Sequence, residues 1–434
     1  MNLREPAGLP PAAHQIKTTR NRQEYLMNLR DKLAQQGFLC SWSEISGAFG
    51  DLGILLPLAV SLITVNGFPA TAVFFGIGVA YILTGLFYRL PLPIQPLKAV
   101  SAIAIAYGLS TAVVVAAGWW MGLILLFLAV THAWSWLDKW FTRPVIRGIQ
   151  LGLALLLVQS GVALASRPQV VPGGEERVIT LAIGTLPAGW LVALVAAGLL
   201  IWALRQRRWP ASLTVLAFGV LVALTVGGGT RLMGHIRLAM TFPRPAMPAA
   251  GDMAQALFLL VLPQLPLTLG NAVYATVDTA QTYFGTRAQR VNPRNLLTTM
   301  GIAQLLAALF GGVPVCHGSG GLTAHYRLGA RSGTAPVLMG LLCLALALFV
   351  DGNALPILAL IPYPILGTLL IFVGIQHGLL ARDLRGWEEW AVAGLTAGLG
   401  FWSRNLAIGF GAGIILHQSI YLLRHLLRQP SAQA

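Results

Sequence analysis

The sequence predicts an all-α protein that crosses a membrane many times. Of its 434 residues, 56% are hydrophobic and only 10% are charged, and the mean hydropathy is +0.72. Soluble domains carry about 25% charged residues, so a soluble globular fold is excluded. A membrane-spanning helix needs about 20 mostly apolar residues, and the chain after residue 37 divides into about fourteen such runs. Little of the chain remains for a soluble domain.

Glycine, proline and charged residues separate the apolar runs and set the expected elements in order. The segment before them is basic and lacks the apolar core of a cleavable signal peptide, so we expect it to remain attached in the cytoplasm. The expected spans lie near residues 44–65, 68–88, 96–113, 118–137, 145–166, 179–204, 210–229, 254–277, 295–311, 317–328, 334–350, 354–378, 387–402 and 405–423.

The basic residues are distributed unevenly between the two sides of the membrane. With a cytoplasmic N-terminus, fourteen spans place 22 of the 29 Lys and Arg residues on the cytoplasmic side. This positive-inside pattern supports the span count and the orientation in a plasma membrane, or in the inner membrane of a bacterium. The same pattern explains the net charge of +15, so we expect membrane lipid as a partner and no nucleic acid. Cys40, Cys316 and Cys343 are too few for a disulfide framework and are expected to be free thiols.

The two halves of the chain match weakly. Asp51 lies 42 residues before Pro93, and Asn271 lies 43 residues before Pro314. Seven spans per half is an odd number, so the second copy must cross the membrane in the opposite direction. The predicted organisation is a leader over 1–37, a first inverted repeat over 38–229, a second over 230–425, and a short cytoplasmic tail over 426–434 without a regulatory domain.

Two short breaks interrupt the apolar runs at matching places in the two halves. The first, residues 91–98, contains Pro93 and Pro96, and the second, the glycine-rich segment 312–321, contains Pro314. Broken helices at matching positions point to a transporter binding site, because their free backbone groups and helix N-termini face a cavity instead of lipid. We therefore expect half-helices at spans 3 and 10 that meet near the membrane midplane.

Lys98 follows Pro96 in the expected first turn of a half-helix. An ionisable side chain at mid-depth costs roughly 2.5–3.5 kcal/mol on insertion scales, so Lys98 is a functional candidate. Its ammonium would add to the positive end of the helix dipole, and both favour an anion. Two structural interpretations remain, an ion pair with Asp51 or a side chain that snorkels to a surface.

The second break offers Gly318, Ser319 and Gly320 after Cys316 and His317. Small residues let a ligand approach backbone N–H groups, and a hydroxyl and an imidazole add donors, which together suit an oxyanion. Structural interpretations stay open here as well. Glycine-rich loops also occur where helices pack closely, a lone histidine is more often a satisfied buried donor, and a cysteine is more often a gap-filler than a thiolate.

Asp51 lies in a glycine-rich part of the first span, directly after Gly50. A buried carboxylate that takes up a proton near neutral pH is what proton symport requires, so Asp51 is the candidate for proton coupling. The same carboxylate could instead cap backbone amides of an interrupted helix. Asp278 also falls in an apolar run. No pattern in the sequence requires a metal or a cofactor.

Three segments, taken together, resemble the molybdate transporter family, a branch of the sulfate permease superfamily. They are Gly-Ala-Phe-Gly-Asp-Leu-Gly at 47–53, Pro-Ile-Gln-Pro-Leu-Lys at 93–98, and Pro-Val-Cys-His-Gly-Ser-Gly-Gly-Leu at 314–322. The resemblance implies a seven-plus-seven inverted repeat with a core domain and a gate domain, an elevator-like movement, and a homodimer. It also implies a tetrahedral oxyanion, molybdate or sulfate, as the substrate.

The resemblance also assigns residues to the site. The sequence departs from the family pattern at Ile54, where Thr is frequent, and at Ser319, where Ala is usual, which would move a hydroxyl ligand. The implied substrate-binding residues are Gln95, Lys98, Cys316, His317, Gly318, Ser319 and Gly320. From the sequence pattern itself we add Asp51 as the candidate for proton coupling, and Gly50, Asn271, Pro93, Pro96 and Pro314 as supporting residues.

The expected function is uptake of such an oxyanion by alternating access. A nucleobase permease of the same architecture would want a carboxylate where the eighth span offers Asn271. A small-anion channel would use the same site chemistry and remains an alternative. An intramembrane aspartyl protease would need a Gly-x-Gly-Asp motif, but Ala48 stands at its first glycine, and it would need a second buried acid. An enzyme is therefore not expected.

Overall fold

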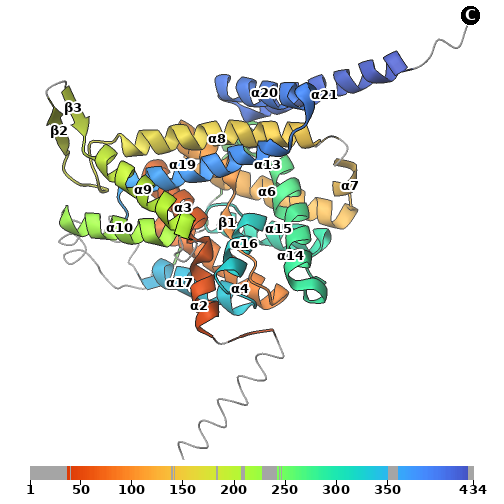
Figure 1. Ribbon diagram of the computed structural model, residues 1–434. Coiled ribbons are helices and arrows are strands. Elements are labelled where there is room, and N and C mark those ends of the chain that lie inside the picture. Colours follow the sequence, from red (N-terminus) through yellow and green to blue (C-terminus); the bar gives the residue numbers. More distant parts are fainter. Residues whose placement is uncertain are drawn as a thin grey trace, which may run out of the picture.

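The computed structural model describes residues 37–39, 41–137, 140, 142–181, 184–206, 211–226, 242–243, 245, 247–349 and 360–428. Nearly all of the expected leader, most of the expected tail, and Cys40 lie outside the described residues. Within them the chain is mostly helical (Figure 1). Cys316 and Cys343 are free and buried, as expected.

Short strands interrupt a long succession of helices along the described chain. The helices are α2 (Trp42–Ala48), η1 (Phe49–Asp51), α3 (Leu52–Asn66), α4 (Ala70–Tyr88), α5 (Lys98–Tyr107), α6 (Thr111–Thr131), α7 (Trp134–Leu137), α8 (Arg143–Ala165), α9 (Gly189–Gln206), α10 (Ala211–Thr225), α12 (Ala250–Ala256), η2 (Leu257–Val261), α13 (Leu262–Leu267), η3 (Thr268–Tyr274), α14 (Ala275–Phe284), η4 (Gly285–Ala288), α15 (Pro293–Leu309), α16 (Ser319–Arg327), α17 (Thr334–Phe349), α19 (Tyr363–Leu379), η5 (Leu380–Asp383), α20 (Gly386–Trp402) and α21 (Leu406–Arg428). The strands are β1 (Gln95–Pro96), β2 (Val178–Leu181), β3 (Gly184–Pro187) and β4 (Val315–Cys316).

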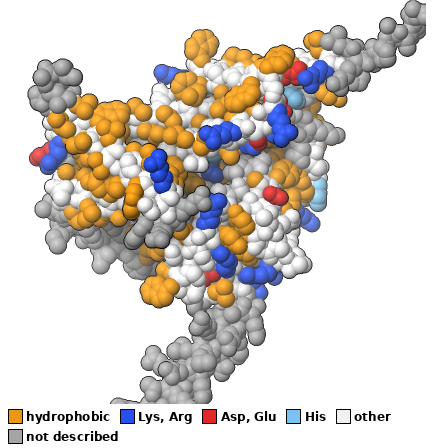
Figure 2. All heavy atoms as spheres, in the orientation of Figure 1, with side chains coloured by type: hydrophobic (Ala, Val, Ile, Leu, Met, Phe, Trp, Pro, Cys, Tyr) orange, Lys and Arg blue, Asp and Glu red, His pale blue; other side chains and the backbone are white. Residues whose placement is uncertain are grey.

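Eight of the described helical stretches are long and apolar enough to cross a membrane. This confirms a helical protein with many membrane spans, while the number fourteen stays a prediction. Figure 2 shows hydrophobic side chains over much of the visible surface, which suits a surface that faces lipid. The eight are Trp42–Asn66, Ala70–Tyr88, Thr111–Thr131, Arg143–Ala165, Gly189–Gln206, Ala250–Ala288, Tyr363–Asp383 and Leu406–Arg424, and shorter apolar helices cover Lys98–Tyr107, Ala211–Thr225 and Thr334–Leu348.

Several expected spans differ from the observed elements. The break expected between 113 and 118 lies earlier, because α5 ends at Tyr107 and α6 runs over Thr111–Thr131. The span expected over 179–204 begins later, because β-branched residues in 178–181 pair with 184–187 as an antiparallel hairpin and α9 starts only at Gly189. The span expected over 254–277 is a longer helical stretch in which α13 lies between two π-helical segments, η2 and η3. Pro263 and Pro266 fall in α13. Both proline and π-helical turns interrupt the regular hydrogen bonding of an α-helix and are common where helices kink.

The helices pack in two groups, each drawn from both halves of the chain. In the first helix group, α4 packs against α15 and α17, and α6 packs against α12 and α15. In the second helix group, α8 packs against α19, α20 and α21, and α9 packs against α10 and α19. Figure 1 shows α20 and α21 above α8 at the top of the view. Helices α3, α5 and α13 lie at the boundary, where α5 and α13 contact α8, and α3 contacts α19.

The two predicted breaks meet as a short antiparallel ladder. Gln95 of β1 lies opposite Cys316 of β4, and Pro96 lies opposite Val315. The pairing continues into the next residue, because the backbone N–H of Leu97 donates to the Pro314 carbonyl at 2.9 Å. Helices α5 and α16 begin directly after the paired strands, so the ladder brings the N-termini of two short helices together.

A close contact between two glycines holds α8 against α19 in the second helix group. A Cβ atom on Gly161 would lie 2.6 Å from the carbonyl oxygen of Gly367, and a Cβ atom on Gly367 would clash with the Gly161 carbonyl. Small residues allow helix backbones to approach in a membrane, where packing replaces the hydrophobic effect as the driving force. The spacing of α8 and α19 therefore depends on this glycine pair.

Replacing Gly161 by alanine should lower the midpoint of thermal unfolding in detergent. The new methyl group would overlap a backbone carbonyl that cannot turn aside, and overpacking typically costs about 1–3 kcal/mol. Gly198→Ala in α9 is the matched control, because a Cβ there meets nothing within 4 Å and alanine favours a helix. Equal unfolding midpoints in the two variants would contradict the importance of the Gly161 contact.

Candidate functional site

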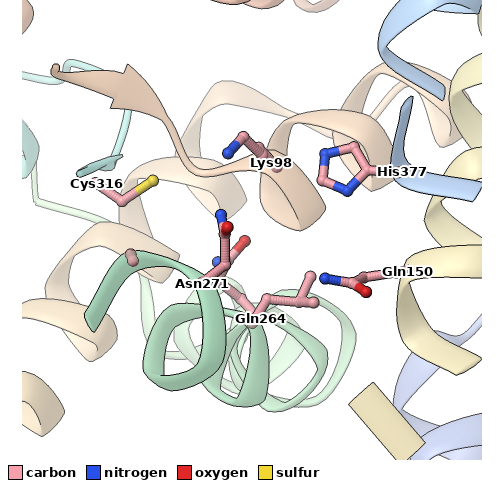
Figure 3. A pocket seen from close by; sticks show the side chains of 8 residues that line it. Lys98, Gln150, Gln264, Asn271, Cys316 and His377 are labelled. Carbon is pink, nitrogen blue, oxygen red and sulfur yellow. The ribbon is translucent and has the colours of Figure 1, made fainter. Parts of the chain in front are cut away.

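A small cavity lies where the ladder and α5 meet α13 and η3 on one side and α8 and α19 on the other. Its volume is about 10 Å³, roughly the space of one water molecule. Figure 3 shows polar side chains converging on it from the ladder, from α5, α13 and η3, and from α8 and α19 of the second helix group. The lining residues are Lys98, Gln150, Gln264, Leu267, Asn271, Ala272, Cys316 and His377.

Lys98 supplies a buried positive charge to this cavity. It is the first residue of α5 and only 7% exposed, so its side chain does not snorkel to the surface. Its Nζ atom would lie 3.2 Å from a Cβ built on Gly318, which places the ammonium beside the start of α16. Among the ion pairs that the structure describes, none joins Lys98 to Asp51 or to another carboxylate. The ion-pair and snorkelling interpretations are therefore not what the structure shows.

The Gln264 side chain accepts hydrogen bonds from the backbone amides at the start of α5. Its Oε1 atom accepts hydrogen bonds from the backbone N–H groups of Ala99 at 2.9 Å and Val100 at 3.3 Å, while its Nε2 donates to Thr268 Oγ1 at 3.0 Å. The first N–H groups of a helix have no partner within the helix and attract anions. A neutral carbonyl oxygen thus takes the place that an anion would take.

The second break contributes Cys316 to the cavity lining, together with Asn271 from η3. Ser319, the first residue of α16, donates its hydroxyl to Asn271 Oδ1 at 3.1 Å. Gly320 is exposed, and a Cβ on it would meet nothing within 4 Å. The start of α16 is therefore accessible, and its hydroxyl is positioned by a residue that lines the cavity.

His317 is turned away from this cavity. Its ring is buried, with Nδ1 3.1 Å from the Pro93 carbonyl oxygen and Nε2 3.3 Å from Thr299 Oγ1. The ring also packs edge-on against Tyr88. Both ring nitrogens thus have partners in the protein. This geometry corresponds to the structural interpretation of His317 as a buried histidine whose hydrogen bonds are satisfied.

Asp51 lies behind the cavity and is not among the residues that line it. It is 1% exposed, accepts a hydrogen bond from the Tyr81 hydroxyl at 3.1 Å, and accepts another from Gln95 Nε2. A Cβ on Gly321 would lie 2.6 Å from Asp51 Oδ1, so this glycine lets α16 pack directly over the carboxylate. Asp51 precedes α3 but its side chain does not cap that helix.

The other predicted supporting residues, Gly50, Pro93, Pro96 and Pro314, make their contacts through the backbone. The Pro93 carbonyl fixes His317, and the Pro314 carbonyl accepts from the residue after Pro96, which itself lies in the ladder. Gly50 lets η1 approach α16, because a Cβ there would lie 2.9 Å from the backbone of Ala324. These contacts join the first span to both breaks.

Three polar residues of the cavity are not predicted from the sequence: Gln150, Gln264 and His377. Gln264 lies near Pro263 and Pro266, so the prolines could have marked it. Gln150 and His377 lie within uninterrupted apolar helices, and their only local signal is a polar side chain at mid-helix. Finding them requires the packing of α8 and α19 against the ladder.

Comparisons with known proteins give the chain a family. A family model described as molybdate transporter of the MFS superfamily matches residues 43–157 and 256–376. Molybdate transporter 2 of Arabidopsis thaliana is 27% identical over 405 residues, which cover 86% of each chain. A probable sulfate transporter of Mycobacterium tuberculosis is 26% identical over 320 residues, covering 71% of this chain and 54% of that protein.

The fold also resembles a solved structure, the transmembrane domain of the cyanobacterial bicarbonate transporter BicA. The TM-score is 0.58 at 18% identity, and the likeness covers 86% of this chain and 96% of that one. The likeness shows a shared transmembrane fold.

The matched ranges of the family model contain every residue that lines the cavity except His377, which directly follows the second range. The family consists of transporters, which confirms the expectation that the protein is a transporter and not an enzyme. Asp278, the candidate for the second buried acid of the protease alternative, is exposed on α14. Since the family model matches more than half of its residues, the protein belongs to the molybdate transporter family.

Proposed function

We propose that the protein carries a tetrahedral oxyanion, molybdate or sulfate, into the cytoplasm by alternating access. The observation that carries this proposal is the buried Lys98 ammonium beside the adjoining N-termini of α5 and α16, without an ion-pair partner among the described residues. The names of the molybdate and sulfate transporters that the chain resembles support the same substrate class.

The charges at the site favour a dianion. The N-terminus of a helix acts as about half a positive charge, and α5 and α16, of ten and nine residues, are long enough to contribute. Together with the Lys98 ammonium, the two N-termini supply about two positive charges. A tetrahedral dianion would neutralise them, whereas no carboxylate lines the cavity to bind a nucleobase.

Asp51 would couple this binding to a proton. When ionised, the Asp51 carboxylate cancels part of the positive charge that the dianion needs. When protonated, it leaves that charge to the substrate and can still accept from Tyr81 and Gln95. Binding of the proton and binding of the dianion therefore favour each other, and this coupling is reciprocal.

The closed cavity favours a carrier over a channel. A volume of about 10 Å³ cannot hold a tetrahedral oxyanion unless the walls move apart, and a continuous pore would need no such movement. The two helix groups are the natural moving parts, with the ladder in the first and α8 and α19 in the second. In this proposal, fourteen spans form two inverted repeats over 38–229 and 230–425, the leader is cytoplasmic, and the protein works as a homodimer in the plasma membrane.

Lys98→Ala should weaken molybdate binding by about 10- to 100-fold, because a hydrogen bond to a charged group contributes about 1.5–3 kcal/mol. Isothermal titration of purified protein with sodium molybdate, repeated with sulfate, measures the change and ranks the two anions. Lys98→Arg is the matched control, since it keeps the charge and should retain part of the affinity. Unchanged binding in the alanine variant would remove Lys98 from the site.

Asp51→Asn should uncouple transport from the proton gradient while keeping the size of the side chain. Uptake of labelled molybdate into proteoliposomes should no longer respond to an imposed inward proton gradient, because Asn cannot exchange a proton. Exchange of internal for external molybdate without a gradient should continue. If the gradient still drives uptake in this variant, Asp51 is not the coupling residue.

Gln264→Glu should abolish oxyanion binding without lowering the thermal stability. A carboxylate would keep the hydrogen bonds to the α5 amides and would itself neutralise Lys98, so the substrate would meet a filled site. Gln264→Leu should do the reverse, lowering the unfolding midpoint by leaving two amides unpaired while adding no competing charge. Identical behaviour of the two variants in titration and thermal unfolding would contradict this role of Gln264.

A further inference from the structure

We propose that Gln150 and His377 complete the oxyanion site from the second helix group, so that the bound dianion contacts this group as well as the ladder and the starts of α5 and α16. This inference rests on the proposed function, because it takes the cavity at Lys98 as the substrate site. Both side chains line that cavity, on α8 and α19 respectively. They face a ladder and two helix N-termini that belong to other parts of the chain.

His377 has a buried polar atom that nothing in the described protein satisfies. The residue is 8% exposed, and its Nδ1 atom has no hydrogen-bond partner among the described residues. The ring lines the cavity, and Figure 3 shows it beside the start of α5, while the Lys98 side chain extends from that helix toward Cys316. Leaving a buried polar group unpaired costs about 1–3 kcal/mol, a cost that disappears when a ligand oxygen accepts a hydrogen bond from the ring.

Gln150 is held with its donor toward the cavity. Its Oε1 atom accepts a hydrogen bond from Arg147 Nη1 at 2.8 Å, and Arg147 in turn binds both carboxylate oxygens of Asp383, at 2.9 and 2.5 Å. Figure 3 shows the amide nitrogen of Gln150 on the cavity side and its oxygen away from it. Rotating the amide would break the contact with Arg147, so Gln150 presents an N–H group to whatever occupies the cavity.

Two neutral donors on this wall suit a tetrahedral dianion. Lys98 and the helix N-termini already supply about two positive charges, so the remaining oxygens need hydrogen bonds and no further charge. Donors on opposite walls can reach different oxygens of a tetrahedral anion. A spherical anion such as chloride, with a smaller radius, cannot span them equally well. The second wall therefore contributes to selection for oxyanions.

Contact with both walls would also link substrate binding to the arrangement of the two helix groups. Lys98 and His377 both line the cavity, and the Nδ1 atom of His377 has no hydrogen-bond partner among the described residues. A bound dianion would accept hydrogen bonds from both walls, and it would stabilise the arrangement in which the walls stand apart by the width of the anion, because it binds that arrangement preferentially. Arg147 acts as a positioning residue, because it orients Gln150 without reaching the cavity lining.

The test is isothermal titration of purified full-length protein with sodium molybdate. His377→Leu and Gln150→Leu should each weaken binding by about tenfold, while His377→Gln, which restores a donor, should recover most of the loss. Gln304→Leu is the matched control. Gln304 is also a fully buried glutamine with an amide lacking partners among the described residues, but it lies on α15 outside the cavity lining. Its replacement should leave molybdate binding unchanged.

Gln150→Glu provides a readout that does not depend on tolerance of an apolar side chain. The carboxylate keeps the contact with Arg147 and the shape of the side chain, so the unfolding midpoint should hold. Its second oxygen would face the dianion and repel it, so molybdate binding should fall by more than in Gln150→Leu. Chloride competition, measured in the same titrations, should become stronger relative to molybdate in all variants that lose a donor.

The outcomes separate this inference from the proposed function. If wild-type protein binds molybdate and Lys98→Ala does not, but the Gln150 and His377 variants bind like Gln304→Leu, the second helix group supplies no ligand and the inference is overturned. If wild-type protein binds neither molybdate nor sulfate, or Lys98→Ala binds as wild type does, the proposed function itself fails.

Discussion

The pairing of β1 with β4 is the contact on which the rest of the site depends. Within a membrane, backbone groups that leave a helix must find partners inside the protein, because lipid offers none. The two breaks solve this for each other, with residues 95–97 bonded to residues 314–316 from the other half of the chain. Neither break can form alone without leaving buried groups unpaired, so the placement of Lys98 and the start of α16 are parts of one local structure.

Around this ladder, polarity is concentrated at the boundary between the two helix groups. Inside each group, helices approach through small residues, as at Gly161 and Gly367. At the boundary, amide and imidazole side chains replace apolar contacts, including Gln150, Gln264 and His377. Of these three, Gln264 makes hydrogen bonds to the start of α5, and such hydrogen bonds can be exchanged for those of a ligand.

The sequence predicted the parts of the site whose signals are local. Proline and glycine marked both breaks, and an isolated charge in an apolar run marked Lys98 and Asp51, which are buried as expected. The direction of His317 was not predictable, because it depends on a carbonyl 224 residues away. Gln150 and His377 were missed for the same reason, since only the packing of α8 and α19 brings them to the cavity. The residues 178–187 were assigned to a span, since a short apolar run does not distinguish a hairpin from a helix.

The oxygen of Gln264 at the start of α5 has a consequence for a carrier when it is empty. A carrier that works by alternating access must return without its cargo, and exposed helix amides would then either face lipid unpaired or bring water with them. Because the Gln264 side chain satisfies the N–H groups of Ala99 and Val100, the proposed movement of an empty carrier would not require water to accompany these amides. In the proposed function, an arriving anion would replace the Gln264 oxygen as the acceptor for these amides. Selectivity would then reflect how much more strongly the amides bind a charged oxygen than a neutral amide oxygen.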